Sequence, residues 1–275
     1  MSVEHTRLSP VAEEAASNNG FELASRSKPD VVGITPEEKA VRVDLAAAYR
    51  LCALHGWDDL IYTHISAKVP GPEHHFLVNP LGLGFDEITA SSLVKIDLDG
   101  NIIGESKYRP NAAGFVIHGG IHQVREDAVS IMHLHTEHGM ALSILEEGLL
   151  PLTQHAMRFY ERIGYHDYEG IALSNDERKR LINALGSHNA LVLRNHGTLT
   201  VGKSVGAAFV EMFYLEKAAR AQLLATAGNR PIRIPDQKIC ALTAQQWQDD
   251  FSSTHNREWP ALLRKLTRLA PGYDV

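Results

Sequence analysis

The chain has 275 residues and a formal net charge of −6, so it carries no basic footprint for a nucleic-acid partner. No apolar run approaches the ~20 residues of a membrane span, and the first residues contain no apolar segment typical of a secretory signal. Cys52 and Cys240 are the only cysteines, so we expect no disulfide framework and a cytoplasmic location. A hydrophobic fraction of 44% is ordinary for a globular domain with a substantial core.

The first predicted elements follow an N-terminal arm. Residues 1–35 lack an apolar period and form this arm, which we expect to be poorly ordered or loosely docked. Thr35 and Pro36, followed by two glutamates, predict the start of a helix that ends near Gly56. Apolar runs bounded by turn residues then predict three strands, at 61–69, 75–78 and 93–98.

Helices and strands alternate in the second half of the chain. A predicted helix at 112–126 leads into an apolar strand that holds His133 and His135. After this strand we predict helices at 138–146, 177–185 and 205–227, and strands at 172–173 and 191–194. Residues 229–275 are predicted to be a tail with short helices at 244–251 and 259–269. The alternation indicates an α/β domain over residues 36–228.

Three histidines form the most informative pattern. His133 and His135 flank Leu134 in an apolar strand, so their imidazoles share one face. His196 follows a second apolar run and precedes Gly197. Three imidazoles with one open position are typical of a catalytic metal site. An isolated pair of this spacing is more often structural, and the second apolar run favours the metal interpretation.

Several separated blocks resemble the class II aldolase/adducin family. They are GWDDLIYTHISAKVPG, FLVNPLGLGFDEITASSLVKIDLDG, NAAGFVIHGGIHQVREDAVSIMHLHT, YHDYEGI and LVLRNHGTLTVGKSV. The resemblance runs from about Pro36 to Gly228. It implies a three-layer α/β/α sandwich with a central mixed, mainly antiparallel sheet. It also implies a homotetramer with active sites at subunit interfaces.

The same resemblance implies a metal site. His133, His135 and His196 match the metal-binding histidines of the family, in which zinc is usual. Iron(II), manganese and cobalt also suit such ligands. In family members that cleave sugar phosphates, the metal polarises a carbonyl group and a glutamate transfers the proton.

The chain departs from the sugar-phosphate aldolases at the substrate. Their Ser-Ser-Glu block corresponds here to Ala112, Ala113 and Gly114, so the glutamate and two phosphate-binding serines are replaced. Family position also assigns Gly82 to the substrate site. Glycine transfers no proton and alanine donates no hydrogen bond. Ordinary phospho-aldol chemistry is therefore not expected.

Other residues are candidates for proton transfer. The phosphate loop of the family appears as THIS, with His64 where asparagine is expected. His118 lies one helical turn after Gly114, and Tyr165 or His166 could enter from a neighbouring subunit. For each of these residues, a hydrogen-bonded core or interface position is the alternative.

The resemblance to the adducin-type branch, through NAAGF and YHDYEGI, leaves three functions open. The first is a metal-dependent lyase, decarboxylase or epimerase acting on a small carbonyl or hydroxy-acid substrate. The second is a non-haem iron oxygenase, since glycine at the base position frees volume. The third is a catalytically silent binding or scaffolding oligomer. No long, lysine-rich tail follows Gly228, so an actin-type partner is not predicted.

Overall fold

The computed structural model describes residues 33–110, 112–170, 175–228 and 230–275, all within the compact unit Val31–Val275. The strand expected at 172–173 lies outside these residues, as does nearly all of the predicted arm at 1–35. Every element discussed below belongs to this unit.

A seven-stranded mixed sheet, counted over the described residues, forms the centre of the unit in the order β3-β2-β1-β4-β7-β6-β5. Neighbouring strands are antiparallel except β5 and β6, which are parallel. The strands are β1 His64–Lys68, β2 Phe76–Val78, β3 Val94–Ile96, β4 Ser130–Leu134, β5 Ile163–His166, β6 Ala190–Leu193 and β7 Gly197–Gly202. The expected mixed, mainly antiparallel sheet is confirmed.

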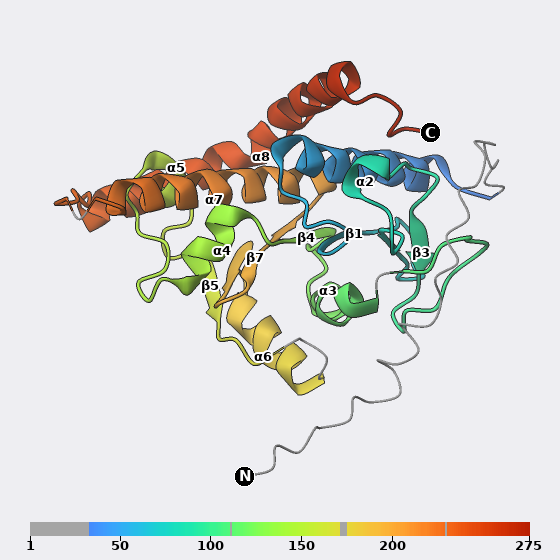
Figure 1. Ribbon diagram of the computed structural model, residues 1–275, viewed down its shortest axis with the longest axis horizontal. Helices are drawn as coiled ribbons and strands as arrows, with labels where there is room; N and C mark the ends of the chain where they lie inside the picture. Colours follow the sequence, from blue (N-terminus) through green and yellow to red (C-terminus); the bar gives the residue numbers. More distant parts are fainter. Residues whose placement is uncertain (1–32, 111, 171–174, 229) are drawn as a thin grey trace, which may run out of the picture. The chain divides into compact units, whose positions relative to one another are not determined.

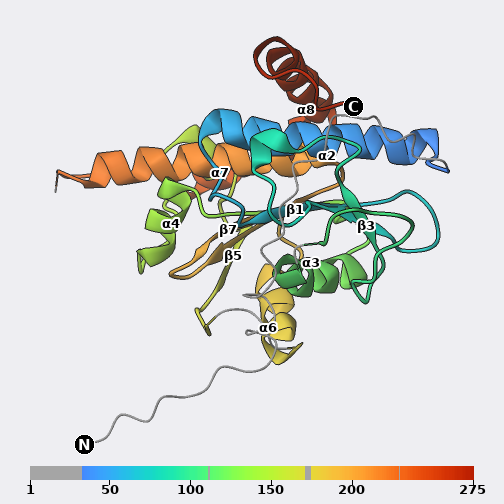
Figure 2. The same cartoon turned by 45° about the vertical axis from the view of Figure 1, so that its right-hand side comes forward.

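Helices cover both faces of the sheet. Figures 1 and 2 show α2, α4 and α7 on one face and α3 and α6 on the other, which confirms the three-layer sandwich. The helices are α2 Pro36–His55, α3 Ala112–Val124, α4 Glu137–Ile144, α5 Gln154–Met157, α6 Asn175–Leu185, α7 Val205–Thr226 and α8 Gln237–Leu269, with a 3-10 turn at Phe85–Glu87.

Strand β4 carries apolar side chains to both layers. Met132 and Leu134 pack in the core formed with α2 and α7, whereas Ile131 packs with α3 and α6. Because side chains alternate along a strand, His133 faces the same layer as Ile131. That face holds the candidate site described below.

Helix α2 forms as its sequence predicts and fixes the start of β1. The Thr35 hydroxyl accepts a hydrogen bond from the Glu38 backbone at 3.1 Å, and Gly56 ends the helix in the left-handed conformation with φ 66°. From the middle of α2, the buried Tyr49 hydroxyl accepts from Ile65 N at 2.7 Å and donates to Ile65 O at 2.5 Å. This pair of bonds anchors β1 to the helical layer.

Two strands were not predicted as separate elements. Strand β5 lies in the YHDY region, and β7 follows directly after the short turn at residues 194–196. Glycines at both ends of β7 and threonines within it lack the continuous apolar character used to predict strands. Its pairing with β4 and β6 determines the structure instead.

The C-terminal region differs from the prediction of two short helices. The structure has one helix, α8, with Pro260 inside it. Tertiary contacts hold the helix on both sides of the proline. Before it, Trp247 Nε1 donates to Gln154 O and Trp259 Nε1 donates to Asp44 Oδ1, each at 3.0 Å, and after it Leu266 is buried in the core formed with α2 and α7. These contacts outweigh the local helix-breaking signal. Over the described part of the chain, none of the helices has the length and apolar character needed to cross a membrane.

Candidate metal centre

The fold brings His133, His135 and His196 together; we call them the metal triad. One ligand atom from each residue lies within 4.8 Å of those of the others. His133 lies on β4, His135 one residue beyond the end of that strand, and His196 in the turn between β6 and β7. Because β7 pairs with β4, the turn before β7 places His196 beside the other two. The three ring centroids are 4.8–4.9 Å apart.

The backbone around His196 explains the Asn-His-Gly sequence. Asn195 has φ 54°, a left-handed conformation that asparagine tolerates better than most residues. At Gly197, an added Cβ atom would lie 2.5 Å from Leu134 O and 3.1 Å from the His135 ring. Only glycine allows β7 to approach β4 this closely, and the approach is what joins His196 to His135.

Two of the three imidazoles are oriented by hydrogen bonds. His133 Nδ1 lies 3.1 Å from Thr198 O, and His135 Nδ1 lies 2.9 Å from Asp59 Oδ2. Carbonyl and carboxylate oxygens only accept, so both Nδ1 atoms donate, and in the neutral ring the lone pair then lies on Nε2. The buried Nε2 of His135 has no hydrogen-bond partner within the described residues. This arrangement fits a divalent metal, whose histidine ligands are ordinarily oriented in this way.

The charge state of the triad also suits metal binding. Burial, followed by the nearby His64, His196 and His135, lowers the pKa of His133 well below its usual value. Burial and His135 lower the pKa of His196 to about 4. Both rings are therefore neutral at pH 7, and neutral imidazole is the form that binds a metal.

His64 and His118 continue this cluster away from the triad. His64 pairs with His133 across β1 and β4, and their ring centroids are 5.4 Å apart. The ring of His118, on α3, lies 4.3 Å from that of His64, and its side chain is almost fully buried. Thr63 precedes His64 with φ 62°, which is rare for a β-branched residue. The strained position is in keeping with a functional site.

Tyr165 and His166 lie on opposite faces of the sheet. Tyr165 packs in the layer of α4 and α7, and its hydroxyl accepts a hydrogen bond from Leu149 N at 3.0 Å. His166 faces α3 and α6, with its Nε2 4.0 Å from carboxylate oxygens of Glu169 and Glu177. Of these two residues, only His166 therefore lies on the same face of the sheet as the triad.

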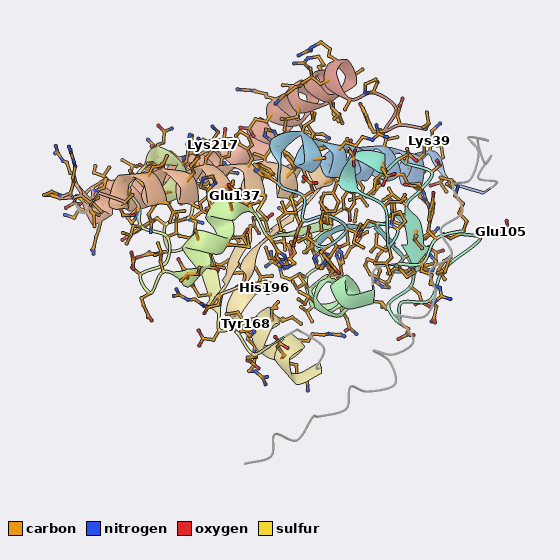
Figure 3. The ribbon with its side chains drawn as sticks, viewed as in Figure 1. Lys39, Glu105, Glu137, Tyr168, His196 and Lys217 are labelled. Atoms are coloured by element: carbon orange, nitrogen blue, oxygen red, sulfur yellow. The ribbon has the colours of Figure 1, made fainter. Side chains whose placement is uncertain are left out.

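Tyr168 is a neighbour of the triad that the sequence did not single out. Its ring centroid is 6.2 Å from that of His196 in an edge-to-face arrangement, and Figure 3 labels both side chains. A small pocket between β6 and α6 is lined by Tyr168, His166 and His196. The sequence also did not identify Asp59, the acceptor for His135 Nδ1. A histidine that binds a metal ordinarily needs such an acceptor for its second ring nitrogen, but the sequence does not say which residue supplies it.

The residues assigned to the substrate site by family position lie at or near the N-terminus of α3. Ala112, Ala113 and Gly114 form the first turn of that helix, and their side-chain surroundings are outside the described residues. Gly82 has φ 95° in a turn beside Arg109, where Leu81 N donates to Arg109 O at 2.8 Å. The structure thus places Gly82 near the segment that leads into α3.

The fold and triad agree with comparisons to known proteins. The family model described as Class II Aldolase and Adducin N-terminal domain matches residues 43–223. The chain therefore belongs to the class II aldolase/adducin family, whose class II aldolases typically bind a divalent metal.

Individual relatives cover most of the chain. A Caulobacter vibrioides protein provisionally named an aldolase class 2 protein is 50% identical over 87% of this chain and 94% of its own length. The crystal structure of an aldolase II superfamily protein from Pseudomonas syringae has 47% identity and a TM-score of 0.83, over 88% of this chain and 98% of that one. The structure of L-fuculose 1-phosphate aldolase from Glaciozyma antarctica has 29% identity and a TM-score of 0.76, over 89% of this chain and 96% of that one.

Proposed function

We propose that this protein is a metal-dependent enzyme of the lyase, decarboxylase or epimerase type that acts on a small carbonyl or hydroxy-acid compound. The metal triad would hold zinc. The observation that carries this proposal is the convergence of three imidazoles, with the Nδ1 atoms of His133 and His135 already donating to Thr198 and Asp59. A metal bound there would polarise a carbonyl group and stabilise negative charge on the adjacent oxygen.

The proposed chemistry differs from that of a sugar-phosphate aldolase. Gly114 stands at the first turn of α3, where the family resemblance implies the proton-transferring glutamate. Glycine has no side chain to accept a proton. His64 and His118 are the proposed replacements, because their rings continue the cluster from His133 into the layer of α3. His166 is a further candidate on the same face, and Tyr165 would act only from a neighbouring subunit.

The remaining parts of the proposal concern assembly and location. We infer a cytoplasmic homotetramer with its active sites at subunit interfaces. Support comes from the family membership and from Cys52 and Cys240, which are both buried and unbonded. A small-molecule substrate is favoured over a macromolecular one because the triad faces the interior layer of α3 and α6.

Two observations favour a catalytically silent binding protein instead. The glutamate position is occupied by Gly114, and rat alpha-adducin is 43% identical over 73% of this chain, which spans 28% of that protein. The two proposals differ in what they require of the triad. A binding protein needs no neutral imidazoles oriented through their Nδ1 atoms, so the geometry supports the enzyme.

The test begins with elemental analysis of the purified protein. We expect about one divalent metal per chain, removed by chelation and restored by zinc, as for other open sites of this kind. The zinc-loaded protein should catalyse exchange of the α-protons of dihydroxyacetone in deuterated water, followed by NMR. A matched His133→Ala variant should bind no metal and catalyse no exchange.

Other outcomes would redirect the proposal. Stoichiometric metal in His133→Ala would contradict the triad assignment. Metal-dependent oxygen consumption after aerobic loading with iron(II) would favour the oxygenase, because a lyase consumes no oxygen. Metal binding without any exchange would favour the silent binding protein.

A further inference from the structure

A chain of hydrogen bonds runs from Ala128 through His122 and Ser66 to His118; we call it the Ser66 chain. Its first bond has one direction only. Ala128 O is a carbonyl oxygen and accepts, so His122 donates from Nδ1 across 2.8 Å. Burial lowers the pKa of His122 to about 3, so the ring is neutral at pH 7. Its Nε2 atom therefore carries no proton and must accept.

The direction of the first bond fixes the remaining two. Ser66 Oγ lies 2.8 Å from His122 Nε2 and 2.7 Å from His118 Nδ1. A hydroxyl group has a single proton, and the bond to His122 uses it. His118 must then donate from Nδ1. Because burial holds the pKa of His118 well below its usual value, its Nε2 atom carries a lone pair and no proton.

The lone pair of His118 Nε2 is buried, and His64 connects its ring to the metal triad. The atom has no hydrogen-bond partner among the described residues. Its Nδ1 is tied to Ser66, so Nε2 lies on the part of the ring away from that hydroxyl, and the adjacent ring is His64 at 4.3 Å. His64 is in turn 5.4 Å from His133. The acceptor thus belongs to the histidine cluster that reaches His133 through His64, one helical turn beyond Gly114.

We propose that His118 Nε2 recognises the substrate by accepting a hydrogen bond from a hydroxyl group. This inference rests on the proposed function, and it assigns the site to a neutral hydroxycarbonyl compound with a free hydroxyl at this position. A buried acceptor without a donor costs free energy, which a hydroxyl group recovers. A phosphate group at neutral pH offers mainly acceptor oxygens and negative charge, so a lone pair repels it.

Three probes of matched shape test this inference on the zinc-loaded protein. Dihydroxyacetone, hydroxyacetone and dihydroxyacetone phosphate share one hydroxycarbonyl end and differ only at the other end. Calorimetry should show that wild type binds dihydroxyacetone about tenfold more tightly than hydroxyacetone, because one hydrogen bond is lost. Dihydroxyacetone phosphate should bind most weakly.

His118→Asn is the decisive variant. Its amide nitrogen can still donate to Ser66, whereas the Nε2 acceptor is removed. We expect unchanged zinc content and a preference for dihydroxyacetone over hydroxyacetone that falls to within about twofold, since the acceptor that distinguishes them is gone. A preference retained at the wild-type level in this variant would overturn the inference.

Nitrogen NMR of protein labelled at histidine gives a second measurement that needs no turnover. We expect an unprotonated His118 Nε2 whose resonance shifts when dihydroxyacetone is added. A protonated Nε2 would overturn the inference, and so would an unprotonated one that no hydroxyl compound shifts, which would indicate only a buried water. A wild type that binds no probe better than His133→Ala would contradict the proposed function, while the nitrogen spectrum would still decide this inference.

Discussion

The metal triad and the Ser66 chain lie on the same face of the sheet, yet they use histidine in opposite ways. The triad is partly accessible, and its oriented rings donate outward to Asp59 and Thr198, so their free lone pairs converge. In the Ser66 chain the rings are buried, and successive bonds satisfy every nitrogen except His118 Nε2. The triad therefore directs several nitrogen lone pairs to one point, whereas the Ser66 chain leaves a single nitrogen, His118 Nε2, as an acceptor.

This difference follows from what surrounds each group. Oxygen atoms that can only accept lie behind His133 and His135, so the Nδ1 atoms donate and the lone pair of each neutral ring lies on Nε2. In the Ser66 chain the only such oxygen is Ala128 O, which fixes the proton of His122 on Nδ1. The Ser66 hydroxyl then donates to His122 and accepts from His118, so the tautomer of His118 is fixed as well. The tautomer of a histidine is therefore set by neighbours that its own sequence spacing does not reveal.

Replacing a member of the triad should have the largest effect. His133→Ala removes one of three ligands, and we expect zinc affinity to fall more than about 100-fold, beyond the range found when an orienting partner is lost. Isothermal titration calorimetry with zinc measures this. His75→Ala, which changes a histidine outside both groups, is the control and should bind zinc as wild type does. Equal losses in the two variants would show that the effect is not specific to the triad.

Gly197→Ala tests the backbone approach that assembles the triad. The added methyl group would meet Leu134 O at 2.5 Å, so β7 must move away from β4. We expect the free energy of unfolding to fall by about 2–3 kcal/mol, as for other overpacked positions, with weaker zinc binding. Urea unfolding measures the first effect. Gly228→Ala is the matched control, because its added atom lies 3.9 Å from the nearest described neighbour, and a similar loss there would contradict this account.

The sequence predicted most of the fold where local signals were strong. The cap at Thr35 and the stop at Gly56 both define α2 through local hydrogen bonds and backbone conformation. Strand β7 and the continuous helix α8 depend instead on distant partners. Pairing with β4 and β6 makes β7, and the anchors at Trp247 and Trp259 hold α8 despite its proline.

The candidate site shows the same division. Spacing on β4 and the family resemblance predicted the members of the triad, which the structure brings together. Neither could predict Asp59 or Ser66, since each meets its histidine across more than 50 positions in the chain. A buried imidazole implies some partner, but only the fold identifies which one.

Removing the carboxylate behind His135 should have a smaller effect than removing a ligand. Asp59→Ala leaves all three imidazoles in place and releases the orientation of one ring. We expect zinc affinity to fall about tenfold, at the lower end for lost orienting groups because Asp59 is partly exposed. Asp58→Ala changes the exposed neighbouring carboxylate and should leave the affinity unchanged. A similar decrease in both variants would indicate a general effect of negative charge.

The smallest predicted effect concerns the Ser66 chain and pH. His122 has a pKa of about 3 in the folded protein and about 6.5 when unfolded. Between these values the unfolded chain binds more protons, so the free energy of unfolding falls as pH is lowered below 6.5 and is insensitive to this residue above it. Lys68 is the charged group that faces His122, and it also disfavours the protonated ring.

His122→Gln isolates that contribution, because glutamine does not titrate and can still accept from Ser66. Urea unfolding of chelated protein at pH 7 and at pH 5.5 avoids any change due to metal release. From pH 7 to pH 5.5, the free energy of unfolding should fall by about 1 kcal/mol more for wild type than for the variant, which is below the limit for binding one whole proton. For the control His75→Gln, the free energy of unfolding should fall by as much as it does for wild type. If His122→Gln lost as much as wild type, the pKa of His122 would not be lowered in the folded protein, and the neutral ring from which the direction of the bonds is argued would lose its support.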